Sequence, residues 1–283
     1  MHRVSLALRG TAGRIVADVR EPAGPGPGRG SVVLLHGGGQ TRHSWSRAAE
    51  TLAGDGWTAV TYDARGHGES DWAADRDYSI ERYVDDLEHV LDQVGGGRPA
   101  CLAGASLGGM TALMGLARRP GLTERLVLVD ITPRPHPDGI ARIKRFMTAH
   151  LDGFDSLEEV AEAVAAYRSA ERRPDTEGLH RNVRRGADGR WRWHWDPAIL
   201  REAGDGPDPL VRPDDAVAAA KSVTVPTLLV AGGASDVVRE DEVGEFLTVM
   251  PTARAVTLDG AGHMVVGDRN DAFVEAIRAF LDD

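Results

Sequence analysis

A serine between two glycines is the residue best placed for nucleophilic chemistry in this 283-residue sequence. Residues 104–108 read Gly-Ala-Ser-Leu-Gly, directly after a short apolar segment typical of a buried strand and before an apolar segment with helical spacing. The small flanking residues permit a turn tight enough to expose the Ser106 hydroxyl above a sheet, as in a nucleophile elbow. We therefore predict that Ser106 is a catalytic nucleophile, rather than part of a turn that only packs a helix on a strand.

A serine hydroxyl is a weak nucleophile unless a base accepts its proton, so Ser106 requires a histidine that a carboxylate orients. Of the ten histidines, His263 lies in a glycine-rich loop after the apparent last strand, at the same expected edge of the sheet as Ser106. Asp236 follows another predicted strand and completes the chain order nucleophile, acid, base. Asp130, at the end of a further strand, is the competing acid, and we favour Asp236.

A glycine-rich loop that could stabilise negative charge follows another predicted strand. Residues 36–39 read His-Gly-Gly-Gly, and their glycines would let backbone N–H groups approach a substrate oxygen. We expect Gly38, with Gly39 as the alternative, to supply one donor of an oxyanion hole, and Leu107 at a helix N-terminus to supply the other. His36 is expected to brace this loop. A phosphate-binding loop is disfavoured because no Gly-Lys-Ser/Thr follows the glycines.

The strands that must position these side chains are short and apolar. Segments that are apolar on both faces belong in a parallel sheet that helices cover. They occur at residues 32–35, 59–62, 100–103, 126–129 and 227–230. Residues 4–8 and 14–19 alternate instead, which predicts a hairpin of half-exposed strands, and residues 79–94 carry the clearest amphipathic helix.

The alternation of strands and helices stops after Val129 and resumes at Val225, which predicts an inserted segment. Within it, residues 156–170 indicate an amphipathic helix. Residues 191–195 read Trp-Arg-Trp-His-Trp, and we interpret the tryptophans as the core of a small helical subdomain rather than a substrate-facing wall. The arginines of the segment are interpreted as a solvent-exposed face, namely Arg172, Arg173, Arg181, Arg184 and Arg185.

Charge and composition disfavour some partners. With 33 Lys and Arg against 43 Asp and Glu, the formal net charge is −10, which argues against binding to nucleic acid or an anionic membrane. No apolar run approaches the roughly 18 residues that a membrane-spanning helix needs. Cys101 is the sole cysteine and the N-terminus lacks the apolar core of a signal peptide, so we expect a cytoplasmic protein without internal disulfides. The sequence does not indicate an oligomeric state.

These motifs together resemble those of the α/β-hydrolase superfamily, in its lid-bearing branch. They follow the expected order over almost the whole chain: the loop at 36–39, Tyr-Asp-Ala-Arg-Gly-His-Gly-Glu-Ser at 62–70, the elbow at Ser106, the acid loop at 232–236 and the base at 262–263. The resemblance implies an α/β fold with a mostly parallel eight-stranded sheet and helices on both faces. Residues 1–132 and 223–283 would form this core, and residues 133–222 a helical lid inserted after strand six. It also implies a structural turn at 63–70, without a catalytic role for Arg65 or His67.

The serine at the elbow separates this chain from relatives resembling epoxide hydrolases and haloalkane dehalogenases, which carry aspartate there. We expect a serine hydrolase, without metal or cofactor, that cleaves a small or medium carboxylic ester, thioester or lactone through an acyl-enzyme. The partner is then a small-molecule substrate. Carbon–carbon bond cleavage or another lyase reaction on the same triad is an alternative, although the Pro-Gly-Ala typical of those hydrolases is Gln-Thr-Arg at 40–42. A low-turnover ligand-binding protein of the same fold is another.

Overall fold

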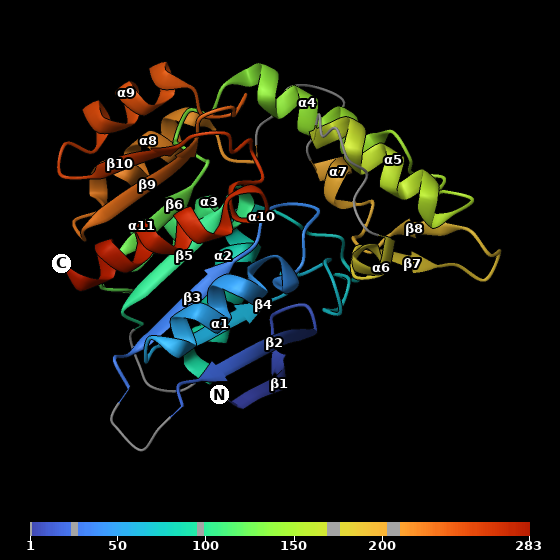
Figure 1. The fold of residues 1–283 in the computed structure, drawn as a ribbon, viewed down its shortest axis with the longest axis horizontal. Coiled ribbons are helices and arrows are strands. Elements are labelled where there is room, and N and C mark those ends of the chain that lie inside the picture. The colour runs from blue at the N-terminus through green and yellow to red at the C-terminus, as the bar shows by residue number, and fades with distance from the viewer. Residues whose placement is uncertain (1, 24–27, 95–98, 169–175, 203–209) are drawn as a thin grey trace.

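The central element is one eight-stranded sheet, seen in a computed structural model that describes residues 2–23, 28–94, 99–168, 176–202 and 210–283 (Figure 1). Its strands lie in the order β1-β2-β4-β3-β5-β6-β9-β10. Their bounds are β1 (His2–Arg9), β2 (Arg14–Glu21), β3 (Ser31–Leu35), β4 (Thr58–Tyr62), β5 (Cys101–Ala105), β6 (Leu126–Val129), β9 (Thr227–Gly232) and β10 (Arg254–Leu258). The pairs β1–β2 and β2–β4 are antiparallel, and all other neighbouring pairs are parallel. The expected mostly parallel eight-stranded sheet is therefore confirmed.

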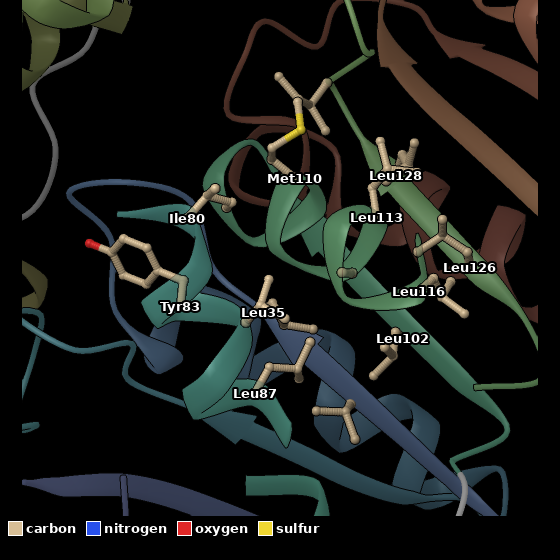
Figure 2. Close-up of a cluster of buried hydrophobic side chains, with 14 of the residues drawn as sticks. Leu35, Ile80, Tyr83, Leu87, Leu102, Met110, Leu113, Leu116, Leu126 and Leu128 are labelled. Atoms are coloured by element: carbon tan, nitrogen blue, oxygen red, sulfur yellow. The ribbon is translucent and has the colours of Figure 1, made fainter. Parts of the chain in front are cut away.

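Alternate residues of the apolar strands are buried under two layers of helices. On β3, Val33 and Leu35 join one hydrophobic cluster, whereas Val32 and Leu34 join the other. The first cluster includes side chains of α2 (Ile80–Gln93), α3 (Leu107–Arg118), α8 (Pro213–Ser222) and α9 (Glu240–Val249), and Figure 2 shows part of it between α2, α3 and the sheet. The second includes side chains of η1 (Arg42–Trp45), α1 (Ser46–Gly54), α10 (Val265–Asp268) and α11 (Asn270–Asp282). Burial on both faces explains why these strands carry so few polar residues.

Residues 137–168 and 176–202 lie between β6 and β9 in the sequence and stand together to one side of the sheet, and we call them the insertion (Figure 1). Their elements are α4 (Pro137–Thr148), α5 (Leu157–Arg168), α6 (Thr176–Leu179), β7 (Val183–Arg185), β8 (Trp191–Trp193) and α7 (Ile199–Glu202). A hydrophobic cluster of its own holds the insertion together, formed by Met147, Phe154, Val160, Ala161, Leu179, Val183, Trp193 and Trp195. The next helix, α8, packs on α3 and α9 of the core.

The insertion is not purely helical, because β7 and β8 form an antiparallel pair. The alternation of aromatic and polar residues at 191–193 is thus the two-residue period of a strand, and the expectation of a helical subdomain is wrong at this point. Trp193 and Trp195 are buried in the insertion's cluster, as the sequence predicts. Three of the arginines expected on a solvent-exposed face are exposed, namely Arg181, Arg184 and Arg185, whereas Arg172 and Arg173 lie outside the described residues.

None of the described helices combines the length and the apolar character needed to cross a bilayer. The cytoplasmic location stays a prediction from the sequence.

Candidate active site

Ser106 occupies the sharp turn between β5 and α3 with φ 47° and ψ −113°, a conformation that non-glycine residues rarely adopt. The neighbouring glycines make this turn possible. A Cβ atom at Gly104 would collide with the backbone of Gly108, and a Cβ atom at Gly108 would collide with the carbonyl oxygen of Leu35. The backbone N–H of Ser106 donates to the carbonyl of Val129 at 3.1 Å, which fixes the turn against the end of β6. This is the geometry of a nucleophile elbow.

A carboxylate contacts His263 at the same edge of the sheet, and it belongs to Asp130. The distance from His263 Nδ1 to Asp130 Oδ2 is 2.7 Å. Asp130 is fully buried and also accepts hydrogen bonds from the Gly232 N–H at 2.9 Å and from the Ser235 hydroxyl at 2.5 Å. A buried carboxylate with three partners has a fixed orientation. Asp130 therefore holds the His263 ring in place.

Asp236, the acid that the sequence favours, is not the partner of His263, contrary to expectation. Its carboxylate instead forms an ion pair with Arg142 of α4, with 3.0 Å between Arg142 Nη1 and Asp236 Oδ2. The physical reason lies in the strand ends. Asp130 directly follows β6, whereas Asp236 comes four positions after Gly232, the last residue of β9. The loop beyond β9 thus turns Ser235, not Asp236, toward Asp130.

Ser106 and His263 lie on one edge of the sheet without a hydrogen bond between them in the described part of the chain. Ser106 follows β5, Asp130 follows β6 and His263 follows β10. The strands β5, β6, β9 and β10 are neighbours in the sheet and run parallel, so all three residues lie at the carboxyl ends of strands, on the same edge of the sheet. The other ring nitrogen of His263, Nε2, has no partner within the described residues. Catalytic hydrogen bonds are often long before substrate binds, and Nε2 is the atom that can accept the serine proton.

The two candidate glycines of the oxyanion loop differ in whether their N–H groups are free to bind a substrate oxygen. The Gly39 N–H donates to His67 Nε2 at 3.1 Å, so Gly39 is not available as a donor, which corrects that alternative. The N–H groups of Gly38 and Leu107 have no hydrogen-bond partner within the described residues. A Cβ atom at Gly38 would meet no other atom within 4 Å, so this position faces open space. Gly38 and Leu107 remain the two candidate donors.

Three buried histidines hold the loop at 36–39 in place. His36 Nε2 accepts from the Ala64 N–H at 2.9 Å, so its Nδ1 carries the proton and donates to the Gly37 carbonyl at 2.8 Å. His67 Nε2 accepts from Gly39, and its Nδ1–H donates to the Arg65 carbonyl at 2.9 Å. Burial lowers the pKa of His36 to about 4 and that of His67 to about 3. These imidazoles are neutral at neutral pH and contact the backbone.

The third histidine, His194, comes from the insertion, and no sequence motif predicts a role for it. Its Nδ1 accepts from the Gly68 N–H at 2.7 Å, which leaves Nε2–H to donate to the Gly39 carbonyl at 3.2 Å. Burial, together with the neighbouring His67 and His36, holds the pKa of His194 well below its usual value. The one sequence signal for His194 is its place between two tryptophans in an alternating segment.

Helix α4 lies over this edge of the sheet, from the acid loop to the oxyanion loop. At one end, a Cβ atom at Gly139 would collide with the carbonyl oxygen of Asp236. Toward the other end, a Cβ atom at Gly39 would lie 3.4 Å from the methyl group of Met147. Between them, Ile143 packs against both the core and the insertion clusters, and Arg142 reaches Asp236. We call α4 the roof of this edge, and beside the two loops it places the apolar Met147 and the cation Arg142.

Metal chemistry has no candidate ligand set in the part of the chain that the structure describes. There, no group of three or more His, Cys, Asp or Glu side chains is arranged to hold a metal ion.

The fold and the sequence are similar to those of known hydrolases. A family model described as the alpha/beta hydrolase family matches residues 32–276. An esterase of Mycobacterium tuberculosis, Rv0045c, is 33% identical over 261 residues, which cover 89% of this chain and 82% of that protein. The sn-1-specific diacylglycerol lipase ABHD11 of Mus musculus is 30% identical over 260 residues, covering 89% of this chain and 80% of that protein.

Among solved structures, the crystal structure of E-2-(acetamidomethylene)succinate hydrolase superposes with a TM-score of 0.82 at 25% identity, and the match covers 100% of both chains.

Proposed function

The chain belongs to the alpha/beta hydrolase family and is an enzyme, and on that premise we propose that it is a serine esterase whose catalytic triad is Ser106, His263 and Asp130. The proposed substrate is a small or medium carboxylic ester, thioester or lactone. The observation that carries the proposal is the 2.7 Å contact between His263 and the buried Asp130, at the edge of the sheet where the elbow places the half-buried Ser106.

The first step forms an acyl-enzyme. His263 Nε2 takes the proton of the Ser106 hydroxyl as the oxygen attacks the substrate carbonyl carbon. The imidazolium that forms is stabilised by Asp130, whose contact at Nδ1 also fixes the ring tautomer. The same proton then passes to the leaving alcohol, thiol or ring oxygen as the tetrahedral intermediate collapses.

Negative charge on the substrate oxygen is stabilised by the N–H groups of Gly38 and Leu107. Donors that are oriented before the reaction need no rearrangement as charge develops, and loss of one such donor lowers the rate by roughly 10²–10³. The Leu107 N–H also lies at the N-terminus of α3, where the helix dipole favours an anion. Water, activated by His263, then releases the acyl group and restores Ser106.

The insertion is proposed as the lid of this site, with α4 as its roof. Apolar side chains of the roof such as Met147 favour an acyl chain over water and shield the charged intermediate from solvent. The boundary of the proposed lid is 137–202, because α8 packs on the core.

The test uses p-nitrophenyl acetate, butyrate and hexanoate with the wild type and Ser106→Ala. The variant should lose at least about 10³-fold in kcat/KM, because the nucleophile is gone. Ser222→Ala, an exposed serine at the end of α8, is the matched control and should retain wild-type activity. A fluorophosphonate probe should label Ser106, as mapped by mass spectrometry. Wild-type turnover by Ser106→Ala would refute the proposal, and labelling without turnover in the wild type would favour a binding protein.

A substrate with a carboxylate on its acyl part is a second candidate, and Arg142 is the observation that favours it. This cation lies on the roof, where its guanidinium stacks on the Tyr167 ring at 5.2 Å while it pairs with Asp236. The solved hydrolase with the similar fold is named for a succinate derivative, which also supports a substrate that carries a carboxylate. A guanidinium recognises carboxylates with directed hydrogen bonds.

Three substrates separate these possibilities. If the carboxylate is recognised, p-nitrophenyl hemisuccinate should exceed p-nitrophenyl butyrate in kcat/KM by at least about tenfold, and Arg142→Met should abolish that ratio. Equal rates would support the simple ester. A dienoic diketone acid tests carbon–carbon bond cleavage. That reaction is supported only if the enzyme cleaves this compound and hydrolyses neither p-nitrophenyl hemisuccinate nor p-nitrophenyl butyrate.

A further inference from the structure

We propose that His194 is a positioning residue through which the insertion sets the geometry of the oxyanion hole. The inference rests on the proposed function and adds a residue outside the triad. Its basis is a row of three buried imidazoles: the ring centroids of His36 and His67 are 5.1 Å apart, and those of His67 and His194 are 6.0 Å apart. Each ring bridges two backbone groups, accepting from one N–H and donating to one carbonyl.

Together these rings fix the peptide groups of the oxyanion loop. In a trans peptide the N–H points away from the carbonyl. The Gly37 carbonyl is held by His36 and by the Gln40 N–H, at 2.8 and 3.1 Å, so the N–H of the same peptide, which belongs to Gly38, is turned the other way. The adjacent Gly39 is held at both ends, by His67 at its N–H and by His194 at its carbonyl. Gly39 has φ +73°. A glycine moves easily between conformations because it has no side chain, so the conformation of Gly39 depends on these contacts.

His194 is the member of this row that comes from the insertion. The segment around it is attached to the turn after β4 by further contacts. The Asp196 N–H donates to the Gly66 carbonyl at 2.8 Å, and the Asp196 carboxylate accepts from the Tyr78 hydroxyl at 2.6 Å. On the other side of Gly39, a Cβ atom would lie 3.6 Å from Trp195 Nε1. Residues 194–196 thus connect the insertion to the oxyanion loop by direct contacts.

The two hydrogen bonds of His194 have separable consequences. The bond from the Gly68 N–H attaches the insertion to the core. The bond to the Gly39 carbonyl orients the loop that carries the Gly38 donor. A purely structural histidine would need both bonds equally, whereas a positioning residue would need the second for catalysis.

A pair of variants tests this distinction. In His194→Gln the side-chain amide lies where Nε2 was and can still donate to Gly39, but the acceptor for Gly68 is lost. In His194→Asn the amide lies where Nδ1 was, so the acceptor for Gly68 stays and the donor to Gly39 is lost. Each variant removes one hydrogen bond of the same buried residue, so each is the other's matched control for stability.

The measurements are kcat, KM and the affinity for a trifluoromethyl ketone, which forms an anionic adduct in the oxyanion hole. We expect His194→Asn to lower kcat by about 10–10²-fold and inhibitor affinity by a similar factor, with KM within about threefold, because the hole acts on the transition state. His194→Gln should keep kcat and inhibitor affinity within about threefold. Equal losses in both variants, no loss in either, or a change confined to KM would overturn the inference.

A readout that does not need activity separates this inference from the proposed function. If the wild type hydrolyses no ester, the proposed function fails, yet amide ¹H–¹⁵N spectra still report on the loop. The Gly38 and Gly39 resonances should move in His194→Asn and stay close to the wild-type positions in His194→Gln. The same shifts in both variants, or none in either, would overturn the role of His194 in that case as well.

Discussion

On one side of the candidate site a histidine faces a carboxylate, and on the other side three histidines face only the backbone. His263 is 11% exposed and contacts Asp130, whereas His36, His67 and His194 are at most 2% exposed and bridge N–H and carbonyl groups. A histidine that must gain a proton during reaction needs a negative partner and access to the substrate. A histidine that must keep an N–H donor on one side and a lone pair on the other must remain neutral. Burial supplies that condition on the oxyanion side.

The largest expected effect tests the carboxylate on the base side. Asp130→Asn should lower kcat/KM for p-nitrophenyl butyrate by about 10³–10⁴-fold, because the amide can neither fix the catalytic tautomer nor stabilise the imidazolium. The variant should fold, since asparagine still accepts from the Gly232 N–H and tolerates the φ of 48° at this position. Steady-state kinetics with a circular-dichroism melt checks both parts. Activity within tenfold of the wild type would remove Asp130 from the triad.

The next prediction compares the effects on stability of removing a histidine from the oxyanion side and from the base side. His36→Ala should lower the free energy of unfolding by about 2–4 kcal/mol, because it leaves a cavity and two buried backbone groups, the Ala64 N–H and the Gly37 carbonyl, without this partner. His263→Ala should change the unfolding free energy by less than about 1 kcal/mol while abolishing turnover. Urea unfolding measures both. If His263→Ala were the less stable variant, the contrast drawn between the two sides would be wrong.

A third effect is a pH dependence of stability on the oxyanion side. In the unfolded chain these imidazoles take up a proton near pH 6.5, whereas in the folded protein the pKa of His36 is about 4 and that of His67 about 3. Their contribution is therefore complete above pH 6.5 and is lost as the pH falls toward 4, by up to about 1.4 kcal/mol per pH unit for each ring.

Urea unfolding at pH 7.5, 6.0 and 5.0 measures this loss. His194→Gln, which removes one buried imidazole, should show a shallower decline than the wild type. A wild-type unfolding free energy that is the same at pH 7.5 and pH 5.0 would contradict the prediction.

The smallest effect concerns the acid that the sequence favoured. Asp236→Asn breaks an ion pair whose carboxylate is 27% exposed and whose guanidinium is 39% exposed, so the unfolding free energy should change by less than about 1 kcal/mol. Its kcat/KM for p-nitrophenyl butyrate should stay within about threefold of the wild type. This variant is the matched control for Asp130→Asn. A loss above a hundredfold would return the acid role to Asp236.

Much of the fold follows from local patterns in the sequence. The apolar segments at 32–35 and 126–129 are buried on both faces, and the alternating ones at 4–8 and 14–19 form the antiparallel edge. Residues 191–193 carry the same two-residue period, yet the pattern of the whole inserted segment favours a helical subdomain for their tryptophans. A strand of three residues needs its partner at 183–185 to be recognised.

For the candidate site, the sequence by itself predicted the sharp turn at Ser106, because the glycines around it are a local steric requirement of that turn. It also placed His263 after the last strand. Only the tertiary structure showed that His263 contacts Asp130 and not Asp236, that the Gly39 N–H is bonded to His67, and that His194 reaches the loop at 36–39. Local sequence constrains backbone conformation over a few residues, whereas contacts between loops depend on how neighbouring strands and the insertion pack. Those contacts join residues that are 28 to 155 positions apart in the chain.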